Sequence, residues 1–295
     1  MALSMSRTAS PAPSQGIPLR ITFVARGFTL VELAIVLFVV ALLLGGMLLP
    51  LSGQQDIRNY GDTQKILVEA REALLGFAMA NDRLPCPASS TSNGQEAFCT
   101  TDSGACTETT LEQIHGRCAK PYDGFLPAAK LGLSPVDAQG YRLDGWGGEP
   151  GNRVRYAVTV ATTATTATNA FTAQNGMKTT GMTVLVPDLK ICSTAVDDTG
   201  TVDIMVSAGT ISADCAATKS LATDGVAVIY SLGKNAGTGG TSINERHNPN
   251  QLPVPLIPAD RAFVNAAQGP NFDDQMLWLS KSTLFNRMVA AGRLP

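Results

Sequence analysis

A long apolar stretch near the N-terminus constrains this chain more than any other feature. From Phe28 to Leu51 the sequence contains a single charged residue, Glu32. About 20 consecutive apolar residues in a helix span a bilayer, so the stretch predicts a transmembrane helix over 28–51. A carboxylate inside such a helix costs roughly 2.5–3.5 kcal/mol of insertion free energy, which indicates that Glu32 has a partner or a function.

The residues before this stretch argue against an ordinary secretory signal peptide. Such a peptide has an apolar core of about 7–15 residues, followed by a small-residue cleavage site. Here the small residue, Gly27, precedes the apolar run, and the basic residues Arg20 and Arg26 lie just before it. Basic flanks stay in the cytoplasm, so the remainder of the chain is predicted to cross the membrane. The plain alternative is a signal-anchor helix with an incidental glutamate.

Residues 27–32 read Gly-Phe-Thr-Leu-Val-Glu, and this motif resembles that of the type IV prepilins and type II secretion pseudopilins. The resemblance implies a leader peptide, residues 1–27, which prepilin peptidase removes by cleavage after Gly27 before it methylates the amine of Phe28. It implies that Glu32 neutralises the amine of a neighbouring subunit. It also implies a single-pass protein of the inner membrane with a periplasmic head, which contacts the inner-membrane assembly platform and enters a pilus or pseudopilus fibre.

Helical periodicity continues after the apolar stretch. Apolar residues recur at spacings of three, four or seven, which places them on one stripe. These residues are Ile57, Tyr60, Leu67, Ala70, Leu74 and Phe77. Pro85 disfavours helical geometry in the residue before it. We therefore expect one long helix over 28–83, and a long N-terminal helix whose second half packs on a sheet is also what the resemblance implies.

The rest of the chain changes character twice. Residues 84–152 are rich in loop-forming residues and cysteine. In residues 153–295, short runs rich in β-branched residues predict strands at 153–160, 182–186, 202–206 and 226–231. A last strand is expected at 276–279, followed by a helix over 281–291. The expected fold class is α+β. In it, the transmembrane helix packs on a C-terminal antiparallel β-sheet head, and the disulfide-held region 84–152 forms a loop insertion.

Six cysteines lie on the side of the chain expected to be translocated. An oxidising periplasm favours disulfides. Cys192 and Cys215 are distant from the others and are expected to pair together. Four cysteines close in sequence admit three pairings that the sequence leaves open: Cys86, Cys99, Cys106 and Cys118.

Two short motifs resemble the head of the major pseudopilins, in which an acidic loop after a Ser-Leu-Gly turn binds calcium. They are Asp144-Gly145-Trp146-Gly147 and Ser231-Leu232-Gly233-Lys234-Asn235. This chain departs from the pattern because Asn235 stands where an acid is common. Asn235, Asp273 and Asp274 are the candidate calcium ligands, although calcium prefers six to eight oxygen ligands. The alternative is that both aspartates cap or pair with backbone near a strand.

The chain shows no basic tract and a formal net charge of −2, which excludes the electrostatic footprint of a nucleic-acid-binding protein. No catalytic motif surrounds either histidine, and we expect no enzyme activity and no catalytic residues. The expected function is that of a pilin-like structural subunit whose partners are other pilin or pseudopilin subunits. The alternatives are a minor pilin or tip adhesin with a ligand-binding head, and a signal-anchored periplasmic enzyme.

Overall fold

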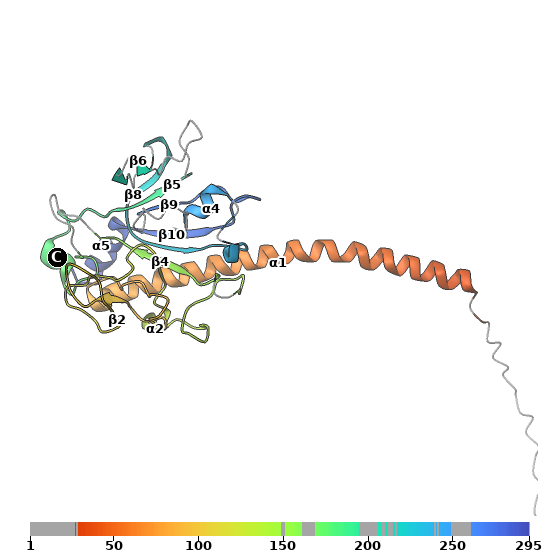
Figure 1. Cartoon of the computed structure of the whole chain (residues 1–295), viewed down its shortest axis with the longest axis horizontal. Coiled ribbons are helices and arrows are strands. Elements are labelled where there is room, and N and C mark those ends of the chain that lie inside the picture. Colours follow the sequence, from red (N-terminus) through yellow and green to blue (C-terminus); the bar gives the residue numbers. More distant parts are fainter. Residues whose placement is uncertain are drawn as a thin grey trace, which may run out of the picture. The chain divides into compact units, whose positions relative to one another are not determined.

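The computed structural model describes residues 27, 29–148, 151–160, 169–194, 206–207, 210–211, 215, 217–238, 240, 242–248 and 261–294. Its contacts divide the chain into two compact units, Met1–Ser52 and Gly53–Pro295. Helix α1 (Leu30–Asn81) contributes residues to both units (Figure 1). The cysteine-containing region 84–152 belongs to the second unit and does not separate from it.

Helix α1 begins and ends where local chemistry dictates. Thr29 lies just before the first helical residue, and its Oγ1 accepts a hydrogen bond from the backbone N–H of Glu32 at 3.2 Å. A threonine at this position satisfies one of the free amide groups of the first turn. At the other end Asp82 adopts a positive φ of 59°, and Pro85 follows three residues later.

The predicted membrane-spanning helix over 28–51 is contradicted. Among the residues that the structure describes, no helix is long and apolar enough to cross a membrane. The expected single-pass placement in the inner membrane falls with this prediction.

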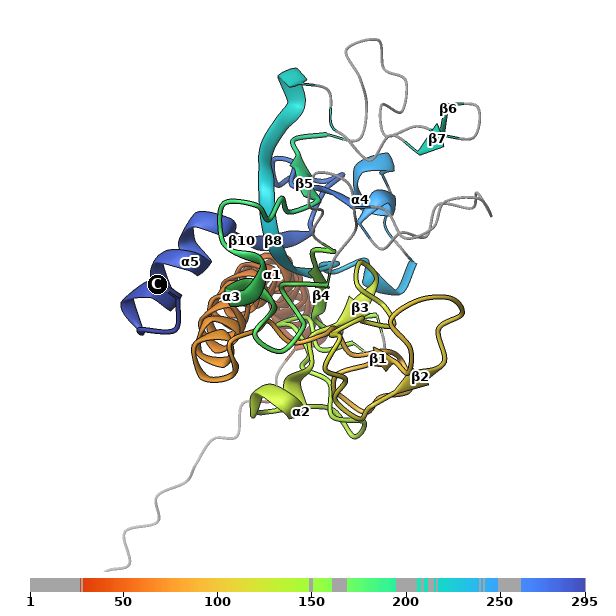
Figure 2. The ribbon, with the colours of Figure 1, turned by 90° about the vertical axis from the view of Figure 1, so that its left-hand side faces the viewer.

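The second half of α1 packs one face against the head. Its buried residues recur at spacings of three and four, as expected for a helix with one apolar stripe. They are Thr63, Leu67, Ala70, Leu74 and Ala78, and Leu75 is buried beside them. Leu67 and Leu74 belong to the main hydrophobic cluster together with Leu284 and Phe285 of helix α5 (Lys281–Ala290). Figure 2 shows α1 and α5 beside the strands of the head.

A six-stranded sheet with strand β8 (Ser220–Ser231) at its centre forms the head. The residues Ala227 to Tyr230 pair with β4 (Arg155–Val158) on one side and with β10 (Gln275–Ser280) on the other. The first half of β8 pairs with β5 (Leu189–Cys192). Strands β3 (Gly124–Phe125) and β9 (Ala262–Val264) extend the sheet beyond β4 and β5 respectively.

The expected antiparallel sheet is wrong in two respects. Strands β5 and β9 pair in parallel, so the sheet is mixed. A parallel pair needs a long crossover, and the chain between these two strands includes β8 and a helix. Strand β3 also comes from the region 84–152, which was expected to be a loop insertion. The expected strand at 182–186 is a turn at 182–184, and β5 starts only after Pro187.

Side chains alternate between the two faces of the sheet. Ala227 and Ile229 of β8 join the cluster that packs on α1, while Val228 and Tyr230 join a second cluster on the opposite face. Successive residues of a strand point to opposite faces, so β8 supplies both cores. The second cluster includes Phe263 of β9, whose ring centre lies 5.4 Å from that of Tyr230.

Three disulfides hold the loop-rich parts of the head. The structure pairs Cys86 with Cys118 and Cys99 with Cys106, and it pairs the two distant cysteines Cys192 and Cys215. Arg83, just after α1, is buried and bonds Glu96 at 2.6 Å. This buried charge pair fixes the end of the helix to the disulfide-held region, where strands β1 (Phe98–Cys99) and β2 (Glu108–Thr109) form a small hairpin.

Short helical elements complete the described residues. Helix α2 (Ala128–Leu131) follows β3, and α3 (Gly176–Thr180) precedes β5. The 3-10 turns η1 (Ala217–Lys219) and η2 (Ala236–Thr238) flank β8, and η2 is followed by α4 (Ile243–His247). The strands β6 (Val206–Ser207) and β7 (Thr210–Ile211) form a separate two-stranded pair.

Gly145 lies close to the backbone of α1 in a loop of the head. Its backbone N–H donates to Thr63 Oγ1 at 2.9 Å, and Thr63 in turn donates to the carbonyl of Asn59. The preceding Asp144 holds the loop by accepting hydrogen bonds from Ser231 Oγ and from the backbone N–H of Trp146. A Cβ on Gly145 would lie 2.3 Å from the Asn59 carbonyl oxygen.

Replacing Gly145 by alanine should therefore destabilise the head. The new methyl group meets helix backbone rather than a movable side chain, and overpacking of this kind costs about 1–3 kcal/mol. Gly76→Ala is the matched control, because nothing lies within 4 Å of its Cβ position and alanine favours a helix by about 1 kcal/mol. Urea unfolding with intact disulfides measures both variants. Equal stability of Gly145→Ala and the wild type would contradict this packing.

Candidate functional site

Three carboxylates meet at one corner of the head. A ligand oxygen from each of Glu245, Asp273 and Asp274 lies within 4.8 Å of the other two. Glu245 and Asp274 are almost completely buried, and Asp273 is partly buried. Three acids so close together and so shielded from water require neutralisation by protons or by a cation.

Three separate segments bring these acids together. Glu245 lies in the first turn of α4, where it forms a capping box with Ser242: the Ser242 hydroxyl accepts from the Glu245 N–H, and Glu245 Oε2 accepts from the Ser242 N–H. Asp273 and Asp274 immediately precede β10. Asn235, in the turn between β8 and η2, donates its Nδ2 to Glu245 Oε2 at 3.0 Å. The site therefore forms only when β8, α4 and β10 are in place.

Hydrogen bonds orient the carboxylates but leave some oxygens unused. Asp273 Oδ2 accepts from the Lys234 N–H at 3.0 Å, and Asp274 Oδ2 accepts from Asn248 Nδ2 at 2.7 Å. The enclosed oxygens Asp273 Oδ1 and Asn235 Oδ1 have no hydrogen-bond partner among the described residues. Buried polar atoms are normally paired, so these two oxygens are candidate ligands for an ion.

The environment opposes ionisation of both aspartates. Burial raises the pKa of Asp273 to about 6, and the neighbouring carboxylate of Glu245 adds to the shift. Burial also raises the pKa of Asp274 well above its ordinary value; the charges of Asp273 and Glu245 act in the same direction, while the hydrogen bond from Asn248 opposes it. A divalent cation would remove this penalty by neutralising the negative charges.

The donor set fits calcium. All of its atoms are oxygens from carboxylate and amide groups, which are the ligands that hard cations prefer. Oxygens bound at 2.3–2.6 Å to one ion lie at most about 5.2 Å apart, which is compatible with the spacing of the three carboxylates. Glu245, Asp273, Asp274 and Asn235 Oδ1 would hold the ion, and calcium would supply charge neutralisation and crosslink the three segments.

The sequence identified three of these residues and missed the fourth. Asn235, Asp273 and Asp274 do lie at this corner, and Asp273 also bonds backbone, as the alternative interpretation expects. Glu245 was missed because it follows Asn235 by ten residues, outside the acidic loop expected after Ser-Leu-Gly. The pattern Ser242-x-x-Glu245 was readable as a helix start, but a capping box does not by itself indicate a ligand.

The predicted processing and assembly residues lie at the start of α1. Gly27 is exposed and Phe28 lies outside the described residues. Glu32 is also exposed, in the first turn of the helix. These residues belong to the first unit of the chain, and the carboxylate corner belongs to the second.

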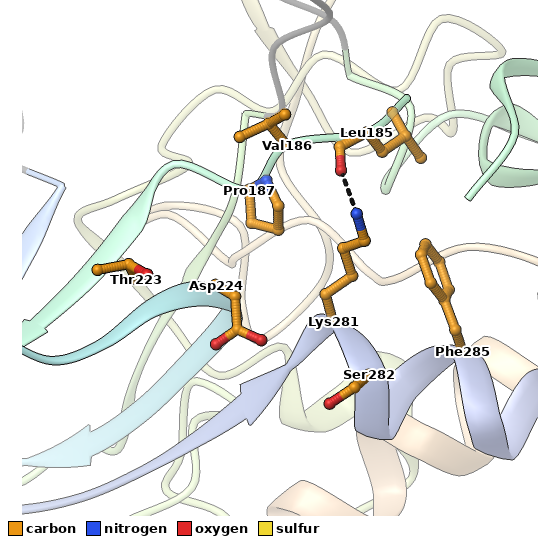
Figure 3. A pocket seen from close by; sticks show the side chains of 8 residues that line it. All are labelled: Leu185, Val186, Pro187, Thr223, Asp224, Lys281, Ser282 and Phe285. Atoms are coloured by element: carbon orange, nitrogen blue, oxygen red, sulfur yellow. Dashed lines mark hydrogen bonds between the residues drawn. The ribbon is translucent and has the colours of Figure 1, made fainter. Parts of the chain in front are cut away.

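An open groove of about 420 Å³ lies between the start of α5 and the segment before β5 (Figure 3). Leu185, Pro187 and Phe285 supply apolar walls, and Lys281 and Asp224 supply the charges. The Lys281 Nζ donates to the Leu185 carbonyl at 2.7 Å. The ammonium group of Lys281 thus links α5 to the neighbouring segment. We interpret the groove as the boundary between two packed segments and not as a catalytic site.

No family model, curated protein or solved structure matches this chain.

The protonation of Asp273 predicts how stability depends on pH and calcium. The folded-state pKa of Asp273, about 6, exceeds the ordinary value of about 3.9, so binding of a proton by Asp273 stabilises the folded state. This contribution to the free energy of unfolding is complete below pH 4 and is lost as pH rises through 6. In chelator, Asp273→Asn should therefore reduce the loss of stability between pH 5 and 7 by about 1–2 kcal/mol, after allowance for solvent screening. Urea unfolding at both pH values measures this difference.

Calcium should stabilise the wild type at pH 7 and stabilise it less at pH 5, where protons compete for the same oxygens. Asp273→Asn should lose most of this effect. Asp224→Asn is the matched control, since Asp224 is an exposed carboxylate in the groove beside α5. The same calcium-induced rise in melting temperature in Asp273→Asn and in the wild type would exclude the proposed ligand set.

Proposed function

We propose that this chain is a pilin-like structural subunit that assembles through helix α1 into a pilus or secretion pseudopilus. The observation that carries the proposal is the exposure of the first part of the helix. Every residue from Leu30 to Leu44 is exposed, including large apolar side chains such as Phe38, which is 66% exposed. Such residues occur on all sides of the helix, so no single partner surface covers them.

Burial of this segment among like helices supplies the driving force for assembly. Removing an exposed leucine, valine or phenylalanine side chain from water contributes about 1.5–3 kcal/mol. The segment from Leu30 to Leu44 carries many such side chains, which include Leu33, Val36 and Leu37. A bundle of parallel copies buries every side of the helix, whereas a single partner leaves part of it exposed.

Glu32 is the one charged residue in this exposed segment, and assembly would place it in an apolar environment. The prepilin-like motif provides a partner: the methylated amine of Phe28 in an adjacent subunit. Desolvation offsets much of the attraction between two buried charges, so the pair sets the register between subunits more than it adds stability. In this proposal the carboxylate corner is a structural cation site that holds the head together.

Glu32 also has a local explanation that any test must separate from assembly. Thr29-Leu30-Val31-Glu32 has the spacing of a capping box, and Thr29 Oγ1 does accept the Glu32 N–H. A glutamate in the first turn also interacts favourably with the helix dipole. Glutamine preserves the capping geometry but removes the charge, so Glu32→Gln distinguishes the two roles.

A minor subunit or tip adhesin is the second candidate function. Leu111 and Ile114 are 73% and 75% exposed, in a loop of the region that the disulfides Cys86–Cys118 and Cys99–Cys106 hold in place. Two exposed apolar side chains on a loop held by disulfides are the observation that favours this candidate. The number of copies of this chain per fibre separates the two candidates, because a tip subunit occurs once at an end.

Processing is the first test of the proposal. Mass spectrometry of the protein from its native host should show a chain that begins with N-methylated Phe28. A bulky residue in place of Gly27 should block cleavage and leave the leader attached, while the disulfides of the head still form. An intact leader on the wild-type protein would contradict the proposal.

Assembly is the second test, and it uses Glu32. Both Glu32→Gln and Glu32→Ala should reduce recovery of the chain in sheared fibres by about tenfold or more, which corresponds to loss of about 1.4 kcal/mol per subunit contact. Total cellular protein and disulfide content should stay at wild-type levels. Thr29→Ala is the control for capping: it weakens the helix start but keeps the charge of Glu32. Normal fibre recovery of Glu32→Gln would show that its charge has no role in assembly.

A further inference from the structure

Hydrogen bonds close two edges of the six-stranded sheet. At the outer edge of β3, the backbones of Ala88 and Phe125 exchange two hydrogen bonds of 2.8 Å each. At the outer edge of β9, the side-chain amide of Asn248 accepts from the Val264 N–H at 2.7 Å and donates to the Val264 carbonyl at 2.9 Å. Unpaired strand edges attract other strands, and these contacts protect β3 and β9 from such pairing.

The outer edge of β10 has no such closure. The carbonyl of Val226 points toward β4, where it accepts a backbone hydrogen bond of 3.1 Å. Because backbone groups alternate in direction along a strand, Ile229 faces the other way and bonds its partner in β10, Leu277. Met276 and Trp278, on either side of Leu277, therefore direct their N–H and C=O groups away from β8. No residue that the structure describes forms a hydrogen bond with these outward groups.

Strand β10 also lacks the residues that usually protect an edge. Natural edge strands carry lysine, proline or a bulge that turns the edge away. From Gln275 to Leu279 the strand contains neither a charge nor a proline, and its one register shift lies at its end, between Leu279 and Ser280. Leu277 and Trp278 remain partly exposed. Open edges of this kind accept an added strand in many complexes.

Charges at the two ends of β10 indicate which strand is added. Asp273 and Asp274 precede the strand, and Lys281 follows it as the first residue of α5. Lys281 Nζ donates to the Leu185 carbonyl at 2.7 Å, so its positive charge has no carboxylate partner among the described residues. An antiparallel second copy of β10 brings the acidic end of each strand beside the basic end of the other. Opposite charges then meet at both ends of the contact.

One register of this pairing uses every outward backbone group. When Leu277 faces its own copy across a two-fold axis, Met276 of each chain lies opposite Trp278 of the other. Each of these two pairs exchanges two hydrogen bonds, which satisfies the outward N–H and C=O groups of both residues in both chains. Met276 and Trp278 contact the same hydrophobic cluster, so the thioether and the indole also lie on one face, where sulfur–aromatic contacts are favourable. The same register places Asp273 beside Lys281, since each lies four residues from Leu277.

We infer that the outer edge of β10 is a contact surface for a second copy of this chain, which adds its own β10 in antiparallel orientation about Leu277. The contact is isologous because the same surface serves in both chains, and it therefore closes as a dimer. The two sheets become one continuous sheet. The contact uses no residue of α1, so it goes beyond the proposed function, and its failure would leave that proposal intact.

A cysteine at the two-fold axis tests the contact directly. Opposite residues of this kind have Cα atoms about 4.5 Å apart, a distance that a disulfide can span. Leu277→Cys in the full chain, expressed in its native host, should therefore give a covalent dimer on a non-reducing gel. Peptide mapping should show position 277 linked to itself. Leu221→Cys is the matched control: Leu221 is 48% exposed but lies outside the part of β8 that β10 pairs, so this variant should give no such dimer.

Charges at the same position separate a contact between chains from a failure to fold. Leu277→Lys places two bases face to face, and Leu277→Glu places two acids face to face. Either change should reduce the co-purification of two differently tagged chains from detergent extracts by about fivefold or more, since like charges directly opposite are destabilising. Expressed together, the two variants should restore co-purification to near the wild-type level, because a base then faces an acid. Disulfide content and urea unfolding report whether each variant folds.

Several results would overturn the contact. One is the absence of a self-linked dimer from Leu277→Cys, and another is equal linking of Leu221→Cys. Charge variants that associate normally, or that mixing does not rescue, would exclude the register about Leu277. A link from position 277 to a different protein would show that the edge of β10 binds another strand and not a second copy of this chain.

Discussion

The burial of one stripe of α1 against the sheet is the interaction on which the arrangement of the rest of the head depends. Leu67, Ala70 and Leu74 occupy the face that packs on the sheet and on α5. Since a helix with one apolar stripe has a single face to give, the opposite face stays free for charges and for other molecules. The close approach of Gly145 to the backbone of α1 then fixes the axial position of the helix.

The carboxylate corner depends on that arrangement through one residue. The backbone N–H of Lys234 donates to Asp273, while its ammonium group lies 2.8 Å from Asp56 of α1. Asp56 and Lys234 are both substantially exposed, so the pair contributes little to the free energy of folding. The pair holds the turn after β8 beside the helix. The same turn contacts Asp273, so it also depends on how the charge of Asp273 is neutralised.

The elements with a strong local signal were predictable from the sequence. A helix over 281–291 was expected, and α5 spans Lys281–Ala290 with Ser280 as its cap, accepting from the Thr283 N–H. The parallel pairing of β5 with β9 was not predictable, because it depends on a crossover between segments distant in the chain. The prediction of the ligand residues missed Glu245 for a similar reason. Its sequence neighbours indicate a helix start, whereas its contacts with Asp273 and Asn235 arise only from the tertiary fold.

The membrane prediction was wrong for a reason that bears on assembly. Apolar side chains around a whole helix satisfy the sequence criterion for a membrane span, but they equally satisfy the criterion for a helix surrounded by other helices. Among the residues that the structure describes, no helix meets the length and apolarity of a membrane span. In the proposed assembly a neighbouring subunit supplies an opposite charge to Glu32, which lipid hydrocarbon does not.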